Sequence, residues 1–192
     1  MRPSSIAEAY AAQEACYRLA ETTYGVVGGA KIATTTKVMQ QLMGIDHPCG
    51  GAIFARTIHA SPATLDSADF VNLRIESEIA LKLGADLPAL ARRGRARRWR
   101  RRSRGGDGRL RADRGPQCGL LEGRSLIVEN CWNGGIVTGA PKALPAGSLA
   151  GIPGRLAIDG KIVGEGKSED PCATLPSPPI MSPNAAAGSK PA

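Results

Sequence analysis

The sequence has few aromatic residues, few histidines and no closely spaced cysteine pair, and each scarcity excludes a class of protein. Aromatic residues make up 4% of the 192 residues, and the two histidines, His47 and His59, stand apart in a polar stretch. The five cysteines are scattered without any C-x-x-C pair, which argues against both a disulfide framework and a zinc ribbon. We therefore expect neither a zinc site nor a small fold held together by disulfides.

Long apolar runs are also missing. No run approaches the roughly eighteen residues of a membrane span, and the N-terminus lacks the basic and then apolar segments of a signal peptide. The hydrophobic content of 42% is nevertheless enough for one domain with a core. These features predict a cytoplasmic protein without a membrane partner.

The net positive charge of the chain comes from one block of the sequence. Residues 89–128 hold thirteen Lys and Arg against three Asp and Glu, whereas the whole chain has a net charge of +8. Outside this block the chain is slightly acidic. Trp99 is the only aromatic residue among the arginines between Arg92 and Arg114, so base stacking would be sparse. Nucleic-acid binding through this block would be non-specific, and we expect no specific nucleic-acid partner.

Local patterns predict helices near the N-terminus and strands after them. Ser5 to Glu8 form a capping box that opens a helix to about Thr22, and Thr35 or Thr36 could cap a second helix that runs through Met43. Extended segments are expected at residues 31–33, 53–54, 126–128 and 136–137, and residues 156–163 predict a hairpin with an Asp-Gly turn. The fold class is therefore α+β.

Two carboxylates stand out in the stretch from Val71 to Leu83. Apolar and polar residues alternate along it, which predicts a strand with Glu76 and Glu78 on its polar face. Neighbouring carboxylates on one face repel each other unless a cation lies between them. That cation could be a hard divalent metal such as Mg2+, Mn2+ or Ca2+, or nearby Lys and Arg on a solvated face. The spacing alone leaves both interpretations open.

Several motifs occur in a fixed order over roughly two thirds of the chain. They are Gly29–Thr35, Lys37–Gln41, Gly44–Pro48, Gly51–Phe54, Ile75–Ala80, Leu83–Pro88, Arg124–Asn130, Gly139–Pro141 and Gly160–Gly166. In this order they resemble the 2-keto-4-pentenoate hydratases of the fumarylacetoacetate hydrolase superfamily. The resemblance implies a mixed β structure built around a distorted roll, preceded by the N-terminal helical region.

The resemblance also implies an activity and its residues. Members of this family bind Mg2+ or Mn2+ through three carboxylates, and Glu76 and Glu78 match two of them. The metal would act as a Lewis acid on a small 2-oxo acid, so that water adds to 2-hydroxypenta-2,4-dienoate during the degradation of aromatic compounds. Lys31 matches the active-site lysine, although the residues alone fit a surface lysine at a strand end. Thr35 either orients substrate oxygens or caps a helix. An intact protein of this kind is expected to be a homo-oligomer.

The third carboxylate of the family motif is missing. Asp113 and Arg114 match the end of that motif, and Arg109 stands where the glutamate is expected. A guanidinium at ~4 Å from a metal would cost several kcal/mol even at an effective dielectric constant of about 20. We therefore expect metal binding to be weak and the lyase to be impaired.

The resemblance is interrupted around the arginine block and ends near residue 170. The sequence predicts one hydratase-like domain over residues 1–170, with disorder in residues 89–123 and in a tail from 171 to 192, and a C-terminally incomplete roll. Translation out of frame would explain these edges, and predicts that another reading frame over residues 89–124 restores the missing glutamate. A 2-oxo-3-hexenedioate decarboxylase, an acylpyruvate hydrolase and a non-functional remnant remain alternatives.

Overall fold

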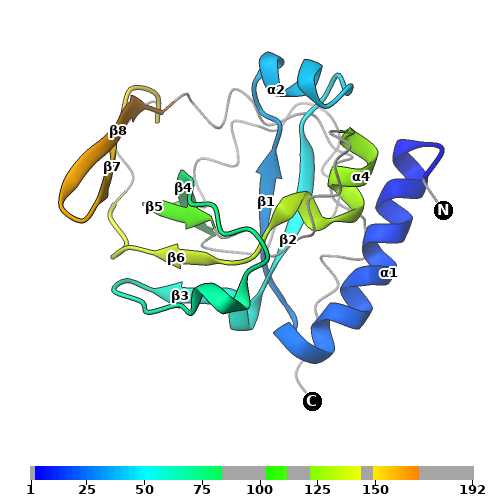
Figure 1. Ribbon diagram of the computed structural model, residues 1–192, viewed down its shortest axis with the longest axis horizontal. Coiled ribbons are helices and arrows are strands. Elements are labelled where there is room, and N and C mark those ends of the chain that lie inside the picture. Colours follow the sequence, from blue (N-terminus) through cyan, green and yellow to red (C-terminus); the bar gives the residue numbers. More distant parts are fainter. Residues whose placement is uncertain (1–2, 84–102, 112–121, 144–148, 169–192) are drawn as a thin grey trace.

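Helix α1 (Ile6–Tyr24) opens the fold. The computed structural model describes residues 3–83, 103–111, 122–143 and 149–168 (Figure 1). The Ser5 hydroxyl accepts a hydrogen bond from the Glu8 N–H at 3.1 Å, which confirms the predicted cap, and the helix ends at Gly25, whose φ is 77°. In the described part of the chain, no helix combines the length and the apolarity needed to cross a membrane.

Strands β1 (Val27–Ala33) and β2 (Cys49–Phe54) form an antiparallel pair. Helix α2 (Lys37–Leu42) connects them and is capped by Thr36. All residues of β2 are buried, because α1 and α4 (Gly123–Val128) pack against this strand (Figure 1). The core at this junction consists of Ala9, Met43, Cys49, Leu126, Ile127 and Cys131.

A second sheet has the strand order β3-β6-β5-β4. Its members are β3 (Ile58–Ala60), β4 (Ser77–Leu83), β5 (Ser103–Arg111) and β6 (Ile136–Thr138). Strand β3 is parallel to β6, and the other pairs are antiparallel. Short 3-10 turns lie at η1 (Ala55–Thr57), η2 (Ser67–Asp69) and η3 (Asn130–Trp132).

Strands β7 (Pro153–Ile158) and β8 (Lys161–Lys167) form the predicted hairpin. Asp159 and Gly160 both have positive φ, 50° and 75°, as the two central residues of a type I′ turn require. The hairpin lies at the opposite side of the molecule from α1 (Figure 1). The α+β class and the Asp-Gly turn were therefore predicted correctly.

Three local predictions differ from the structure. Residues 126–128 belong to helix α4, because their apolar side chains fill the core beside α1, and this packing overrides their preference for strands. The strand predicted from Val71 starts only at Ser77, and Val71, Leu73 and Ile75 are exposed. Strand β5 lies inside the segment expected to be disordered, because its backbone pairs with β4 and β6 without needing an apolar side-chain pattern. The remainder of that segment up to residue 121, and the expected disordered tail from 171 to 192, lie outside the described residues.

Candidate active site

Lys31 lies in the middle of β1, where it is the Cα partner of Gly51 on β2. Its side chain is buried, with 6% of the residue exposed, and Nζ donates to the backbone carbonyl of Cys131 at 3.4 Å. A buried ammonium requires polar partners because desolvation is costly. The structure therefore places Lys31 inside the fold, and the alternative of a surface lysine is wrong.

Two cysteine side chains lie beside this lysine. Cys49 begins β2 and Cys131 lies in η3, and both are fully buried. The Cys131 thiol donates to the Cys49 sulfur at 3.6 Å. The Thr34 hydroxyl lies 3.3 Å from the same sulfur, and its oxygen also accepts the Cys49 N–H at 3.2 Å. Three distant segments thus meet around Lys31.

These contacts lower the pKa of the Cys49 thiol. The largest cause is the hydrogen bond from Cys131, which stabilises the thiolate. Burial opposes this effect, while the Thr34 hydroxyl, His47 and the Lys31 ammonium reinforce it. The environment of Cys49 therefore favours a thiolate more than an ordinary buried cysteine environment does.

The backbone that carries Cys131 has an unusual conformation. Asn130, Cys131 and Trp132 have φ values of 56°, 52° and 53°, in the left-handed region that residues other than glycine seldom adopt. The Asn130 side chain holds this turn against β2, since Oδ1 accepts the Ala52 N–H at 2.7 Å and Nδ2 donates to the Ala52 carbonyl at 2.9 Å. A Cβ on Gly51 would lie 2.7 Å from Asn130 Oδ1, so this close approach requires glycine.

The predicted metal ligands lie on a different strand. Glu76 is exposed and precedes β4, whereas Glu78 is half-buried within β4. Strand β4 is at one edge of its sheet and pairs only with β5 in the described residues. Glu76 and Glu78 are thus two residues apart, but the regular strand includes only the second.

The register of β4 and β5 identifies the residue opposite Glu78. The Cα partner of Glu78 is Arg109, the position at which the family resemblance implies the third carboxylate. Directly opposite positions of an antiparallel pair share one face of the sheet. Positions 78 and 109 are therefore neighbours on one face of the sheet, and an arginine occupies the second.

The donor set does not complete the metal site implied by the resemblance. Among the described residues, no three His, Cys, Asp or Glu side chains come together in a group that could hold a metal ion. Two carboxylates and an opposing arginine position do not fit a three-carboxylate centre. Lys31, Glu76 and Glu78 remain predictions as site residues.

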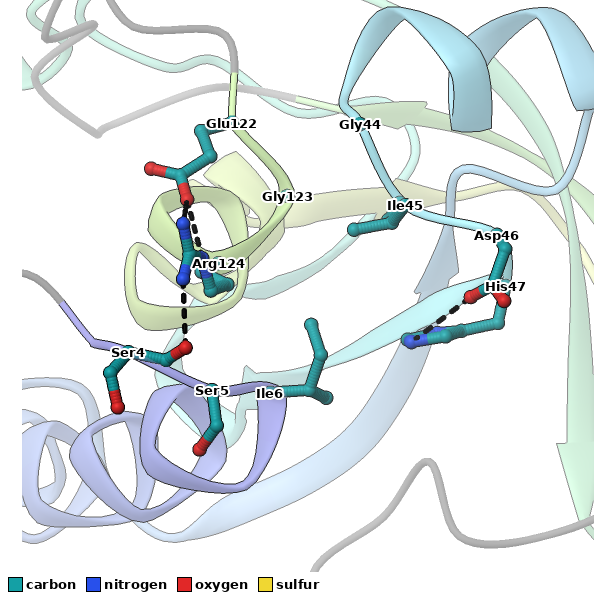
Figure 2. Close-up of a pocket in the computed structure, with 10 residues that line it drawn as sticks. All are labelled: Ser4, Ser5, Ile6, Gly44, Ile45, Asp46, His47, Glu122, Gly123 and Arg124. Carbon is teal, nitrogen blue, oxygen red and sulfur yellow. Dashed lines mark hydrogen bonds and ion pairs between the residues drawn. The ribbon is translucent and has the colours of Figure 1, made fainter.

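A surface pocket of about 540 Å3 lies elsewhere, between the start of α1, the loop before β2 and the start of α4 (Figure 2). Arg124 forms an ion pair with Glu122 on one side of it and donates to the Ser4 carbonyl at 2.8 Å. Asp46 and His47 lie on the opposite side. Neither Lys31 nor the two glutamates line this pocket, so it is distinct from the predicted site.

Sequence reasoning missed the surroundings of Lys31. Thr34, and not Thr35, contacts Cys49, because Thr34 is buried at the end of β1 while Thr35 is exposed. The sulfurs of Cys49 and Cys131 meet although the residues are 82 positions apart, and a spacing rule for nearby cysteines cannot detect such a pair. Both cysteines directly follow matched motifs, which end at Pro48 and Asn130, and this was the only available signal.

Comparison with known proteins supports the resemblance in sequence. No family model matches the chain. Over 81 residues, the chain is 36% identical to a 2-keto-4-pentenoate hydratase from Burkholderia vietnamiensis strain G4; the match covers 42% of this chain and 31% of the relative. The match therefore spans about a third of the length of that curated relative.

Comparison with solved structures supports the fold. Two structures of 4-oxalocrotonate decarboxylase from Pseudomonas putida G7, one complexed with calcium and acetate and one with magnesium and adipate, align with TM-scores of 0.68 and 0.67 at 17% identity. The alignments cover 85% and 88% of this chain and 61% and 63% of those chains. The chain is thus similar over 81 residues to a 2-keto-4-pentenoate hydratase, and over most of its length it shares the fold of the 4-oxalocrotonate decarboxylase structures, of which it spans about three fifths.

Proposed function

We propose that this chain is a metal-dependent lyase of the hydratase type, with impaired activity in its present sequence. Its substrate would be a small 2-oxo acid such as 2-hydroxypenta-2,4-dienoate, an intermediate of aromatic-compound degradation. The agreement between the hydratase-like sequence and the shared fold carries this proposal. We further expect a cytoplasmic homo-oligomer with no specific nucleic-acid partner.

Lys31 is the proposed catalytic residue. Its buried ammonium would hold the substrate carboxylate and transfer a proton at Nζ. The hydrogen bond to the Cys131 carbonyl fixes the direction of the side chain, and the low-dielectric surroundings strengthen its electrostatic effect. The sequence-matched position and the observed burial both support this assignment.

Glu76 and Glu78 are the proposed metal ligands. Mg2+ or Mn2+ held there would supply Lewis acidity toward the 2-oxo acid. Arg109, the register partner of Glu78, adds positive charge and removes an oxygen ligand. We therefore expect weak metal binding and slow turnover.

Restoring a carboxylate at position 109 tests the metal assignment. The R109E variant should bind Mn2+ at least tenfold more tightly than the unmodified chain, measured by titration with electron paramagnetic resonance detection. The matched control is R104E, which makes the same charge change on β5 opposite Lys82. If R104E gains as much affinity as R109E, net charge alone explains the effect. Adding E78Q to R109E should abolish the gain.

Turnover measurements test the reaction. With Mg2+ present, R109E should hydrate 2-hydroxypenta-2,4-dienoate faster than the unmodified chain, and K31M in the R109E background should remove this activity. Release of CO2 from 2-oxo-3-hexenedioate without hydration would favour the decarboxylase alternative, which the solved structures of similar fold make the second candidate. No turnover of either substrate by R109E would overturn the proposed function.

A further inference from the structure

We propose that Cys49 and Cys131 are a peroxide-sensitive dithiol that closes to an intramolecular disulfide beside Lys31. The proposal does not depend on the proposed function, because it concerns only the two thiols and their surroundings. Both sulfurs are buried at the junction of β2 and η3, and they lie 3.6 Å apart.

The fold holds the two sulfurs in contact, 3.6 Å apart, before any bond exists. Cys49 is fixed by the hydrogen bond from its N–H to Thr34 Oγ1 and by its pairing with Ala33 across the sheet. Cys131 follows Asn130, whose side chain is hydrogen-bonded to both the N–H and the carbonyl of Ala52. A disulfide is about 2.05 Å long, so the sulfurs must approach by roughly 1.5 Å.

The groups around the two sulfurs differ, so each cysteine has its own role in the proposed oxidation. Cys131 donates its proton toward the Cys49 sulfur, the Thr34 hydroxyl lies 3.3 Å from that sulfur, and the Lys31 ammonium acts on it electrostatically. Together with His47, these groups hold the pKa of the Cys49 thiol below its ordinary value. Because the thiolate is the nucleophile, Cys49 is the attacking residue and Cys131 is the resolving residue.

The oxidation is balanced with hydrogen peroxide as the oxidant. The Cys49 thiolate attacks one peroxide oxygen, the O–O bond breaks, and the departing hydroxide takes up a proton to become water. Cys49 is then a sulfenic acid. The Cys131 thiol attacks this sulfur, the S–S bond forms and the S–O bond breaks, and the hydroxyl leaves with the thiol proton as a second water. Two thiols lose two electrons in total, and one peroxide gains them.

The sequence allows each cysteine to be followed separately. Trypsin cleavage at Lys and Arg places Cys49 in the peptide 38–56 and Cys131 in the peptide 125–142, while Cys16, Cys118 and Cys172 fall in three other peptides. The reduced full-length chain is treated with millimolar hydrogen peroxide, its remaining thiols are blocked with N-ethylmaleimide, and it is digested without reductant. The expected product is the peptide 38–56 joined to 125–142, lighter by two hydrogens than the sum of the two.

Variants separate this bridge from random oxidation. C16S removes an exposed cysteine and should form the bridge at an unchanged rate. C131S should lose the bridge and accumulate Cys49 sulfenic acid, which dimedone traps, and circular dichroism shows whether the variant folds. Peptide mapping of the unmodified chain tests the proposal without any variant.

The contrary result is equally specific. If 38–56 joins 125–142 no faster than it joins the peptides of Cys16, Cys118 or Cys172, the dithiol proposal is wrong. It is also wrong if the bridge forms only in urea, since the folded geometry then contributes nothing. Reduction with dithiothreitol should regenerate both thiols in the folded protein.

Discussion

Asn130 is the residue on which the geometry around Lys31 and Cys131 depends most. Its Oδ1 accepts from the Ala52 N–H at 2.7 Å and from the Tyr17 hydroxyl at 2.9 Å, and its Nδ2 donates to the Ala52 carbonyl at 2.9 Å. We expect N130A to lower the free energy of unfolding by about 2–4 kcal/mol, because partly buried groups lose partners and alanine tolerates positive φ poorly. Urea denaturation measures this loss.

The matched control for this substitution is N72A, outside the helices and strands, which should shift the denaturation midpoint little. An unchanged midpoint for N130A would mean that the side-chain hydrogen bonds do not hold η3 in place. A second measurement is the peroxide mapping of N130A, in which the bridge between Cys49 and Cys131 should form more slowly.

At this scale the sequence selected single residues but not the side chains around them. Lys31 was selected from a motif and is buried, while its role as a site residue stays a prediction. Glu76 and Glu78 were selected from alternation, but the alternation extended into residues that are not in a strand. Cys131, Thr34 and Asn130 could not be selected because their contacts with β2 arise from tertiary packing.

Helix α1 is attached to the rest of the fold by polar contacts as much as by apolar packing. Only Ala9 and Gln13 of this helix are buried, and Gln13 Nε2 donates to the carbonyls of Gly50 at 3.0 Å and Ile127 at 2.6 Å. Q13A would leave two carbonyls without this donor, so we expect a loss of about 1–3 kcal/mol in stability. Hydrogen exchange should show the faster opening in α1, β2 and α4.

The control for Q13A is R18A, an exposed position on the same helix, which removes a side chain without removing a contact to β2. Equal exchange rates in the two variants would show that the Gln13 hydrogen bonds do not hold α1 against β2 and α4.

The helices, strands and turns were not all predicted equally well from the sequence. Capping residues and the Asp-Gly turn act locally and were read correctly, whereas the parallel pairing of β3 with β6 joins distant segments and has no local signature.

The molecule as a whole should lose stability in alkali because two tyrosines are ionised with difficulty in the folded state. Burial raises the pKa of Tyr10 to about 12, although the hydrogen bond that its oxygen accepts from the Gly50 N–H acts to lower this pKa. Burial also raises the pKa of Tyr17, and the Ala52 N–H opposes it in the same way. Both hydroxyls face β2 from α1, so their ionisation would disturb the junction on which the core is built.

The sign of the effect follows from the direction of these shifts. An unfolded tyrosine ionises near pH 10, so both residues favour the folded state below that pH, and this contribution falls as the pH rises toward about 12. Urea midpoints in reductant should therefore decline from pH 10 upward. The Y10F/Y17F variant should begin less stable but decline less steeply, whereas Y24F keeps both buried hydroxyls and should retain the steep decline. Parallel declines in all three proteins would place the alkaline sensitivity outside the contact between α1 and β2.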